Sequence, residues 1–197
     1  MQIFYLYFLK LQMTQFSLKI FIFAFIFSAC SPMSEIQLDP TIDLNGGFEH
    51  SKNELPYNWY FYTPKTVKKS EFKIFLDQNI YKEGKQSLHF SVTKCSQTGG
   101  HLSPGFSQEF SMEAGKKYTV LFWLKNKGCQ ISAKLGQISI KTGDYKVIKV
   151  DKNNNEWELI SLIYQTKKTE NPSKLRFEFN VLSKGECWVD SFEIKPL

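Results

Sequence analysis

The sequence predicts an all-β sandwich. Several runs alternate apolar and polar side chains with a period of two, as half-buried strands do, and they are rich in aromatic and β-branched residues. Gly, Asn, Pro and Lys turns separate these runs, and no long stretch keeps a helical period. Strands that no helix covers bury their apolar faces against one another, so two packed sheets are expected.

The predicted strands are six alternating runs, at residues 72–77, 87–95, 118–125, 157–164, 175–181 and 188–194. In the runs 118–125 and 157–164 both faces carry large apolar side chains, which predicts central strands. In the last run the alternation puts Trp188, Asp190, Phe192 and Ile194 on one face. An ionised carboxylate among apolar groups is costly unless it is paired, hydrogen-bonded or bound to a metal, which makes Asp190 a candidate ligand residue.

The front of the chain reads as the signal peptide of a lipoprotein, at residues 1–29. A continuous run of apolar or small residues at 20–29 follows Lys19 and is too short to span a bilayer. The tetrad Phe27-Ser28-Ala29-Cys30 resembles a bacterial lipobox, which would make Cys30 the lipidated N-terminus. The alternative is an ordinary cleaved signal that happens to end in Cys, and Met13 is a better start than Met1.

Residues 30–44 carry two prolines and no strong period, so we expect the lipidated Cys30 and a short tether here. The domain would then be exported and held on a membrane of the cell envelope by its lipid anchor, at the outer membrane or the cell surface. The 168 residues after position 29 suffice for one domain with a proper core. We expect a monomer.

Composition argues against two functional classes. The net charge is +6, but Arg176 is the only arginine, and sequence-specific nucleic-acid binding depends on arginine for bidentate contacts. The three histidines have no metal-ligand spacing, and neither a Gly-x-Ser-x-Gly motif nor a Gly-rich phosphate loop is present. We therefore expect neither a nucleic-acid partner nor catalysis.

Three cysteines remain after Cys30, which allows three choices of disulfide. Antiparallel pairing of 87–95 with 187–195 sets Phe90 opposite Phe192 and keeps the apolar pairs on one face. The same register sets Cys95 opposite Cys187, and these two are the predicted disulfide.

Short motifs from Asn45 to Ile194 resemble, in order, those of the CenC-like carbohydrate-binding modules. The matching pieces are Asn45-Gly46-Gly47-Phe48-Glu49, Leu55-Pro56-Tyr57-Asn58-Trp59, Gly84-Lys85-Gln86-Ser87-Leu88-His89-Phe90, Ser107-Gln108-Glu109-Phe110, Ala114-Gly115-Lys116-Lys117-Tyr118-Thr119-Val120 with Phe122-Trp123, Trp157, Leu175-Arg176-Phe177-Glu178-Phe179 and Trp188-Val189-Asp190. The resemblance implies a galactose-binding-like jelly roll over residues 45–197, a sandwich of two antiparallel sheets.

The resemblance also implies a structural calcium ion, held by Glu49 and Asp190 if the two ends of the domain meet. Carboxylate oxygens suit such a hard cation. Many family members follow this Asp with a second one, whereas this chain has Ser191. The alternative is an Asp190 that only accepts hydrogen bonds from backbone amides.

Sugar binding needs flat aromatic platforms and directed polar groups. The candidates are Tyr60 and Tyr62 on the strand face opposite Trp59, His101 in the loop 99–104, and a polar floor of Arg176, Glu178 and Asn180. The resemblance carries over none of these, because ligand residues vary between families of this fold.

The sequence therefore predicts a membrane-anchored lipoprotein that binds a polysaccharide or glycan without catalysis. The alternatives are a structural or protein-interaction lipoprotein of the cell envelope, and an accessory module or minimal enzyme of a glycoside hydrolase system.

Overall fold

The computed structural model describes residues 33–138, 144–169 and 172–197. The predicted signal peptide, Cys30 and the beginning of the predicted tether lie outside this range. No helix among the described residues is long and apolar enough to cross a membrane.

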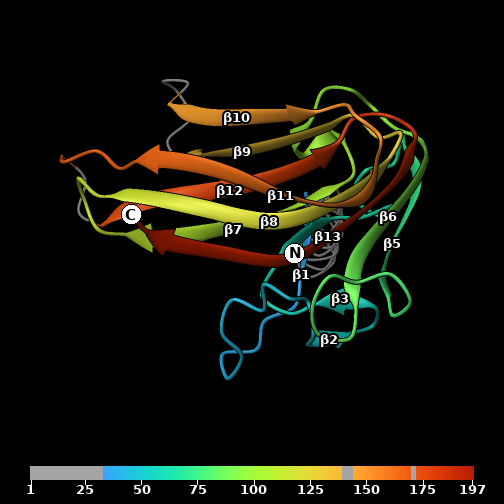
Figure 1. The fold of residues 1–197 in the computed structure, drawn as a ribbon, viewed down its shortest axis with the longest axis horizontal. Coiled ribbons are helices and arrows are strands. Elements are labelled where there is room, and N and C mark those ends of the chain that lie inside the picture. Colours follow the sequence, from blue (N-terminus) through green and yellow to red (C-terminus); the bar gives the residue numbers. More distant parts are fainter. Residues whose placement is uncertain (1–32, 139–143, 170–171) are drawn as a thin grey trace, which may run out of the picture. The chain divides into compact units, whose positions relative to one another are not determined.

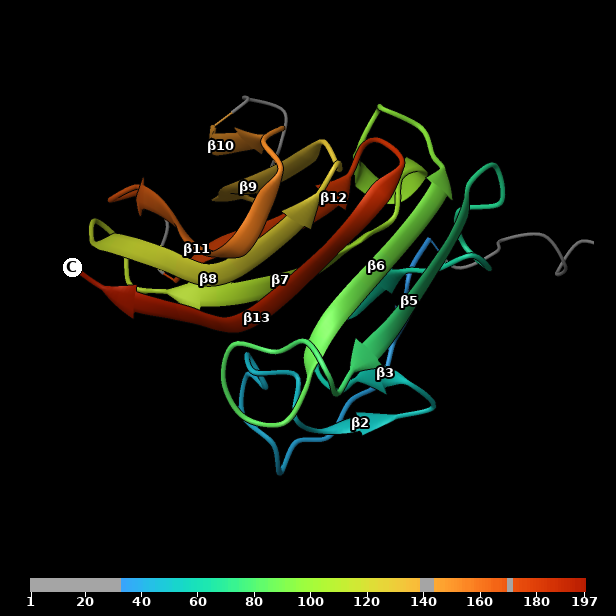
Figure 2. The same cartoon turned by 45° about the vertical axis from the view of Figure 1, so that its right-hand side comes forward.

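The described chain forms two large antiparallel sheets and a small hairpin (Figures 1 and 2). The six-stranded sheet has the order β1 (Glu35–Ile36), β4 (Tyr60–Tyr62), β7 (Gly105–Met112), β12 (Ser173–Val181), β9 (Ile131–Gln137) and β10 (Tyr145–Val150). The five-stranded sheet has the order β11 (Asn154–Gln165), β8 (Lys117–Lys127), β13 (Gly185–Pro196), β6 (Ser87–Lys94) and β5 (Glu71–Asp77). The hairpin pairs β2 (Ser51–Lys52) with β3 (Leu55–Pro56), and the short 3₁₀ helix η1 spans Gly100–Leu102. The predicted all-β sandwich is confirmed.

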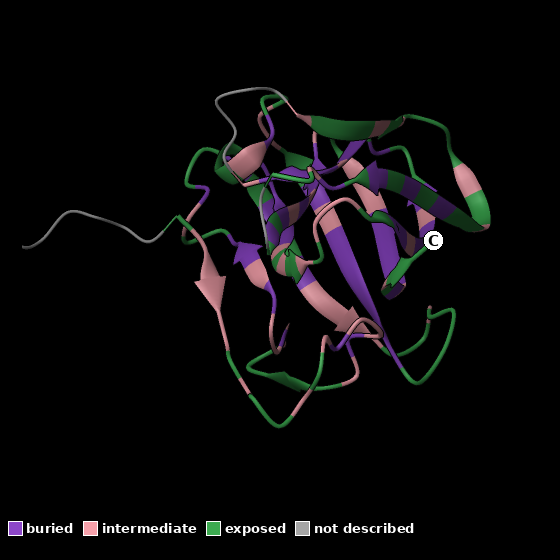
Figure 3. Cartoon of the chain, turned by 90° about the vertical axis from the view of Figure 1, so that its left-hand side faces the viewer, coloured by how far each residue is buried: buried purple, intermediate pink, exposed green. Residues whose placement is uncertain are grey.

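The core between the sheets is largely aromatic. The ring of Phe106 lies near its centre and packs against rings from both sheets, including Phe90 at 6.2 Å and Phe179 at 5.1 Å between centroids. Both partners are fully buried, as expected for inward positions of alternating strands. Figure 3 shows that buried segments run along several of the strands. The side chains between these inward positions point away from the core. On the six-stranded sheet this outer face carries polar residues, among them Arg176 and Glu178.

The two ends of the domain meet at an irregularity in β13. The register of β13 against β8 shifts between Asp190 and Glu193, and Ser191 there has a φ of 50°. The backbone amide of Phe192 donates a 2.8 Å hydrogen bond to the carbonyl of Gly46. A Cβ on Gly46 would lie 1.9 Å from the Phe192 carbonyl oxygen, so only glycine allows this crossing.

Because of this bulge, the residues of the last strand are distributed over its two faces differently from the prediction. Val189 and Phe192 both lie in the core although three positions separate them, because the bulge adds a residue between them. Trp188 and Asp190 consequently lie on the face away from Phe192 and Ile194. The prediction that side chains alternate strictly along this strand was wrong between Asp190 and Glu193.

Residues 35–44, predicted as tether, belong instead to the sandwich. Strand β1 pairs with the edge strand β4. The side-chain amide of Asn58 donates hydrogen bonds to the carbonyls of Asp39, Ile42 and Asp43, at 2.9–3.0 Å. One half-buried amide thus fixes a segment whose own sequence has no strand period.

The predicted register between 87–95 and 187–195 is also wrong. In the structure Cys187 is opposite Phe90, and the ladder ends at Gly185 opposite Val92, before Cys95 is reached. Cys95, Cys129 and Cys187 are free thiols. The predicted register is displaced by five residues, since Phe90 and not Cys95 lies opposite Cys187, and it therefore gives no support to a Cys95–Cys187 disulfide.

Candidate functional site

A polar groove lies on the outer face of the six-stranded sheet. On β12, Phe177 and Phe179 point into the core, so Arg176 and Glu178 point outward. The register places Arg176 opposite Glu109 and Glu178 opposite Ser107, both on β7. Tyr60 is in turn opposite Ser107 from the other side.

The groove encloses a cavity of about 490 Å³. Its walls come from five strands, from η1 and from the residues before β1. Its lining residues are Met33, Ser34, Tyr60, Tyr62, Gly100, His101, Glu109, Lys134, Gly136, Gln137, Tyr145, Arg176 and Glu178. This volume lies within the range typical of small-molecule sites.

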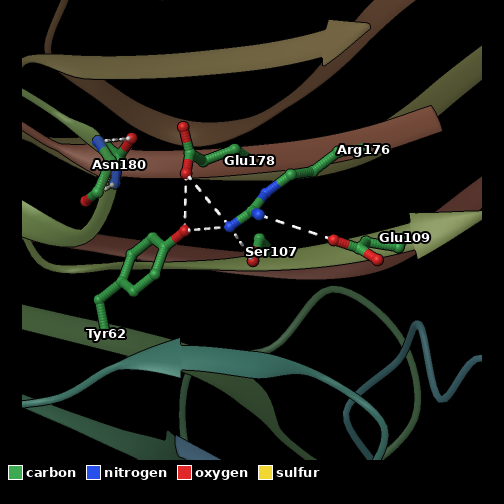
Figure 4. A network of polar contacts seen from close by, with 7 residues as sticks. Tyr62, Ser107, Glu109, Arg176, Glu178 and Asn180 are labelled. Carbon is green, nitrogen blue, oxygen red and sulfur yellow. Dashed lines mark hydrogen bonds and ion pairs between the residues drawn. The ribbon is translucent and has the colours of Figure 1, made fainter. Parts of the chain in front are cut away.

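Arg176 is the centre of the groove floor (Figure 4). Its Nη2 atom donates hydrogen bonds to the Tyr62 hydroxyl at 2.6 Å and to Ser107 Oγ at 3.2 Å. The guanidinium also pairs with Glu109 at 3.6 Å and with Glu178 at 3.7 Å. One cation thus fixes two carboxylates in place, which leaves their remaining oxygens as preorganised acceptors for hydroxyl groups.

The Tyr62 hydroxyl completes the floor by donating a 2.6 Å hydrogen bond to Glu178 Oε1. Burial, together with the nearby charge of Glu178, raises the pKa of Tyr62 to about 12. The phenol therefore stays protonated at neutral pH. Its ring is only 2% exposed, so Tyr62 supports the floor and is not the exposed platform that we predicted.

Two other tyrosines provide accessible ring surface. Tyr60 on β4 is half-buried, and Tyr145 on β10 is 45% exposed. Four interstrand steps separate their strands, which corresponds to about 19 Å measured along the sheet. The two rings therefore lie towards opposite ends of the groove, with the charged floor between them.

The loop before β7 forms one wall of the groove. It carries the exposed His101 within η1. The fully buried Asn180 accepts a 2.8 Å hydrogen bond from the Gly100 amide and donates a 3.0 Å hydrogen bond to its carbonyl. Asn180 therefore holds the loop and is not part of the floor that we predicted.

Five of the six predicted sugar-site residues line this one cavity, and Asn180 supports it from below. Sequence reasoning missed Glu109, Lys134 and Tyr145 as site residues. Glu109 could have been found from the alternation of 107–110, but its position opposite Arg176 requires the strand order. Strand β10 is mostly exposed and gives no clear apolar period, so Tyr145 carried little signal.

The predicted acidic pair meets at the loop 82–85, away from the groove floor. Asp190 Oδ2 accepts hydrogen bonds from the amides of Lys82 and Glu83, at 2.7 and 3.1 Å. Glu49 Oε1 accepts one from the Lys85 amide at 3.0 Å. Burial first, and then the charge of Glu49, raise the pKa of Asp190.

This arrangement fits a cation in part. Two carboxylates share the loop, and in the described part of the chain neither has a cationic side chain as an ion-pair partner. No cluster of three or more acidic, His or Cys side chains suited to a metal occurs among the described residues. Any ion here would need backbone oxygens or water as further ligands, which calcium accepts readily.

Comparison with known proteins supports the fold. No family model and no curated protein matches the sequence. Among solved structures, a CBM4 carbohydrate-binding module matches with a TM-score of 0.57 at 16% identity, over 78% of this chain and 98% of the module. The CBM22-1 xylan-binding domain of Paenibacillus barcinonensis Xyn10C matches with a TM-score of 0.53 at 14% identity, over 77% of this chain and 91% of the domain.

A third similar structure is the enzymatically active domain of tailspike protein 4 from bacteriophage CBA120. Its TM-score is 0.58 at 14% identity, over 79% of this chain but only 21% of the tailspike chain. The fold of this protein is therefore the jelly-roll sandwich of carbohydrate-binding modules, as the sequence motifs predicted.

Proposed function

We propose that the protein binds a polysaccharide or glycan, without chemical conversion, in the groove of the six-stranded sheet. The observation that carries this proposal is the charged floor centred on Arg176 between the rings of Tyr60 and Tyr145. Tyrosine rings can stack on the C–H faces of sugar rings, while fixed carboxylates accept hydrogen bonds from hydroxyl groups in defined directions. The shared fold with carbohydrate-binding modules supports it.

The elongated groove favours a chain of sugars over a single ring. The floor carries two carboxylates and one guanidinium, so its charges do not favour a highly acidic polymer. Affinity gel electrophoresis against a panel of neutral and acidic polysaccharides, with calcium present, tests the proposal. Retardation by at least one neutral polysaccharide is expected, and migration unchanged by every polymer in the panel would refute it.

Glycoside hydrolysis is a second candidate because Glu109 and Glu178 occupy diagonal positions on adjacent strands in the same groove. Hydrolases use two carboxylates across the scissile bond, one of them protonated. Here both carboxylates pair with the same guanidinium, and neither sits in the apolar surroundings that keep a catalytic acid protonated. We expect no reducing sugar to be released from any polysaccharide that binds.

We also propose that Cys30 carries a lipid anchor that holds the groove near a membrane of the cell envelope. Met33 and Ser34 line the cavity, and Cys30 precedes Met33 by three residues, a reach of about 10 Å at most. Stable attachment would need more than one acyl chain. Metabolic labelling with a fatty-acid analogue should mark the wild type and not Cys30→Ser.

We further propose a structural calcium ion between Glu49 and Asp190. Glu49 lies in the first segment of the domain and Asp190 in its last strand, and both bind backbone amides of the loop 82–85. A divalent cation there would neutralise two carboxylates that otherwise repel each other and would stabilise the contact between the chain ends. The proposal is independent of the glycan site, because these residues do not line the groove.

A further inference from the structure

Cys129 and Cys187 lie together at one end of the core. Both side chains are fully buried. Asn126 is directly opposite Cys187 in the ladder between β8 and β13, and its side chain points inward. The same side chain binds Cys129 at both backbone groups, accepting from its amide at 3.0 Å and donating to its carbonyl at 2.9 Å. Asn126 thereby holds Cys129 next to Cys187.

The start of β13 also packs closely against the backbone of Cys129. A Cβ on Gly185 would lie 2.7 Å from the backbone nitrogen of Cys129, so the strand begins in tight contact with the turn between β8 and β9. The Cys129 thiol is near enough to that of Cys187 to contribute to its raised pKa. Cys95 is the third thiol of this region, half-buried at the end of β6.

We propose that Cys129 and Cys187 form a disulfide in an oxidising environment. Strand β8 belongs to the five-stranded sheet and β9 to the six-stranded one, so the turn that holds Cys129 crosses between the sheets. The bond would tie this crossing to β13 and close one end of the sandwich. It would also close a long loop, of the kind whose cross-linking restricts the unfolded chain most.

The oxidant in this reaction would be a small-molecule disulfide such as oxidised glutathione. One protein thiolate attacks the glutathione disulfide, forms a mixed disulfide and releases one glutathione thiolate. The second cysteine then loses its proton and attacks the protein-side sulfur, which releases the second glutathione. Two protein thiols are oxidised to one disulfide, and one glutathione disulfide is reduced to two thiols.

Burial raises the pKa of the Cys187 thiol well above its usual value, and raises that of Cys95 to about 11. A buried thiol of this kind reacts slowly in the folded protein. The bond should therefore form while the chain folds, before the end of the core closes.

The test is refolding of the full chain with Cys30→Ser, reduced in denaturant and then diluted into detergent with reduced and oxidised glutathione. Free thiols are trapped with N-ethylmaleimide, and unreduced peptides are mapped by mass spectrometry. We expect Cys129 linked to Cys187, and Cys95 alkylated. Alkylation of both Cys129 and Cys187, or a link from either one to Cys95, would overturn the proposal.

A stability measurement adds a readout that does not depend on mapping. Reductant should lower the melting temperature of this oxidised protein by about 5–15 °C. Cys95→Ser, which keeps the pair, should show the same loss, whereas the double variant Cys129→Ala/Cys187→Ala should show none. An equal response to reductant in the double variant would count against the bond.

Discussion

Tyr62 and Glu178, 116 positions apart in the chain, share a 2.6 Å hydrogen bond beneath the groove. The bond forms because β4 and β12 both pair with β7, which lies between them. The Tyr62 hydroxyl accepts from Arg176 while it donates to Glu178, so one phenol links the cation of the floor to one of its carboxylates. The groove floor is therefore built as a connected unit.

Removal of this phenol should destabilise the protein. Tyr62→Phe leaves the ring in place but takes a partner from both Glu178 and Arg176, which should lower the free energy of unfolding by about 1–3 kcal/mol. Urea denaturation measures the loss. The matched control is Tyr60→Phe on the same strand, whose hydroxyl makes no hydrogen bond to the described residues. Equal effects of the two variants would contradict the account.

The same hydroxyl predicts a pH dependence in the alkaline range. The pKa of Tyr62 rises from 10.0 in the unfolded chain to about 12 in the folded protein. The folded state thus holds a proton that the unfolded state has lost, and this contribution is complete below pH 10 and lost as the pH approaches 12. The stability difference between wild type and Tyr62→Phe should shrink over this window. A constant difference from pH 9 to pH 12 would argue against a buried, protonated phenol.

The two tyrosines with accessible rings, Tyr60 and Tyr145, should contribute more to binding than to stability. Tyr60→Ala and Tyr145→Ala each remove a sugar platform, and we expect affinity for the polysaccharide identified by gel retardation to fall by roughly 5–30-fold. Tyr81→Ala is the matched control, since Tyr81 is 44% exposed, close to the 45% of Tyr145, but lies outside the cavity. Isothermal titration calorimetry gives the affinities. A loss in Tyr81→Ala as large as in Tyr145→Ala would remove the case for the groove.

Calcium should raise the melting temperature, by about 5–10 °C at 100 times its dissociation constant. Without calcium, the raised pKa of Asp190 means that stability is lost as the pH rises above 3.8, the ordinary value, because the ionised form is penalised in the fold. Glu49→Gln keeps the acceptor for the Lys85 amide but removes the second charge. This variant should be at least as stable as the wild type in EDTA and should lose the response to calcium. An unchanged response would exclude Glu49 as a ligand.

Gly84 should be indispensable to the position of Glu49. Its φ is 72°, and a Cβ there would lie 2.0 Å from Glu49 Oε1. Gly84→Ala should therefore destabilise the protein by about 1–3 kcal/mol, mainly through backbone strain, and should displace the Glu49 carboxylate. The control is Gly100→Ala, which has a φ of 59° but no atom within 4 Å of the added Cβ. Thermal unfolding of the two variants separates the steric part from the strain.

The sequence was sufficient for the fold and for most of the groove because both depend on alternation. The odd positions 175–181 of β12 are apolar and buried, so Arg176 and Glu178 had to face outward together. What sequence could not supply was the pairing of strands. The ladder between β6 and β13 sets Cys187 opposite Phe90 and not Cys95, and Asn58 holds a segment that has no period of its own.

Strand order and covering loops also explain the errors in the predicted groove. Tyr145 belongs to the groove only because β10 lies at the far edge of the six-stranded sheet, an order that no local pattern encodes. Asn180 had the right parity on β12 but lies under the loop of Gly100, which covers it. Parity predicted which face a side chain joins, and the covering loops then decided whether a ligand could reach it.

The most direct test of the central claim is a crystal structure of the protein with an oligosaccharide of the polymer that retards it in the gel. The account predicts sugar rings over Tyr60 and Tyr145, with hydroxyl groups hydrogen-bonded to Glu109 and Glu178. Sugar bound on the outer face of the five-stranded sheet, with the groove containing only water, would contradict it.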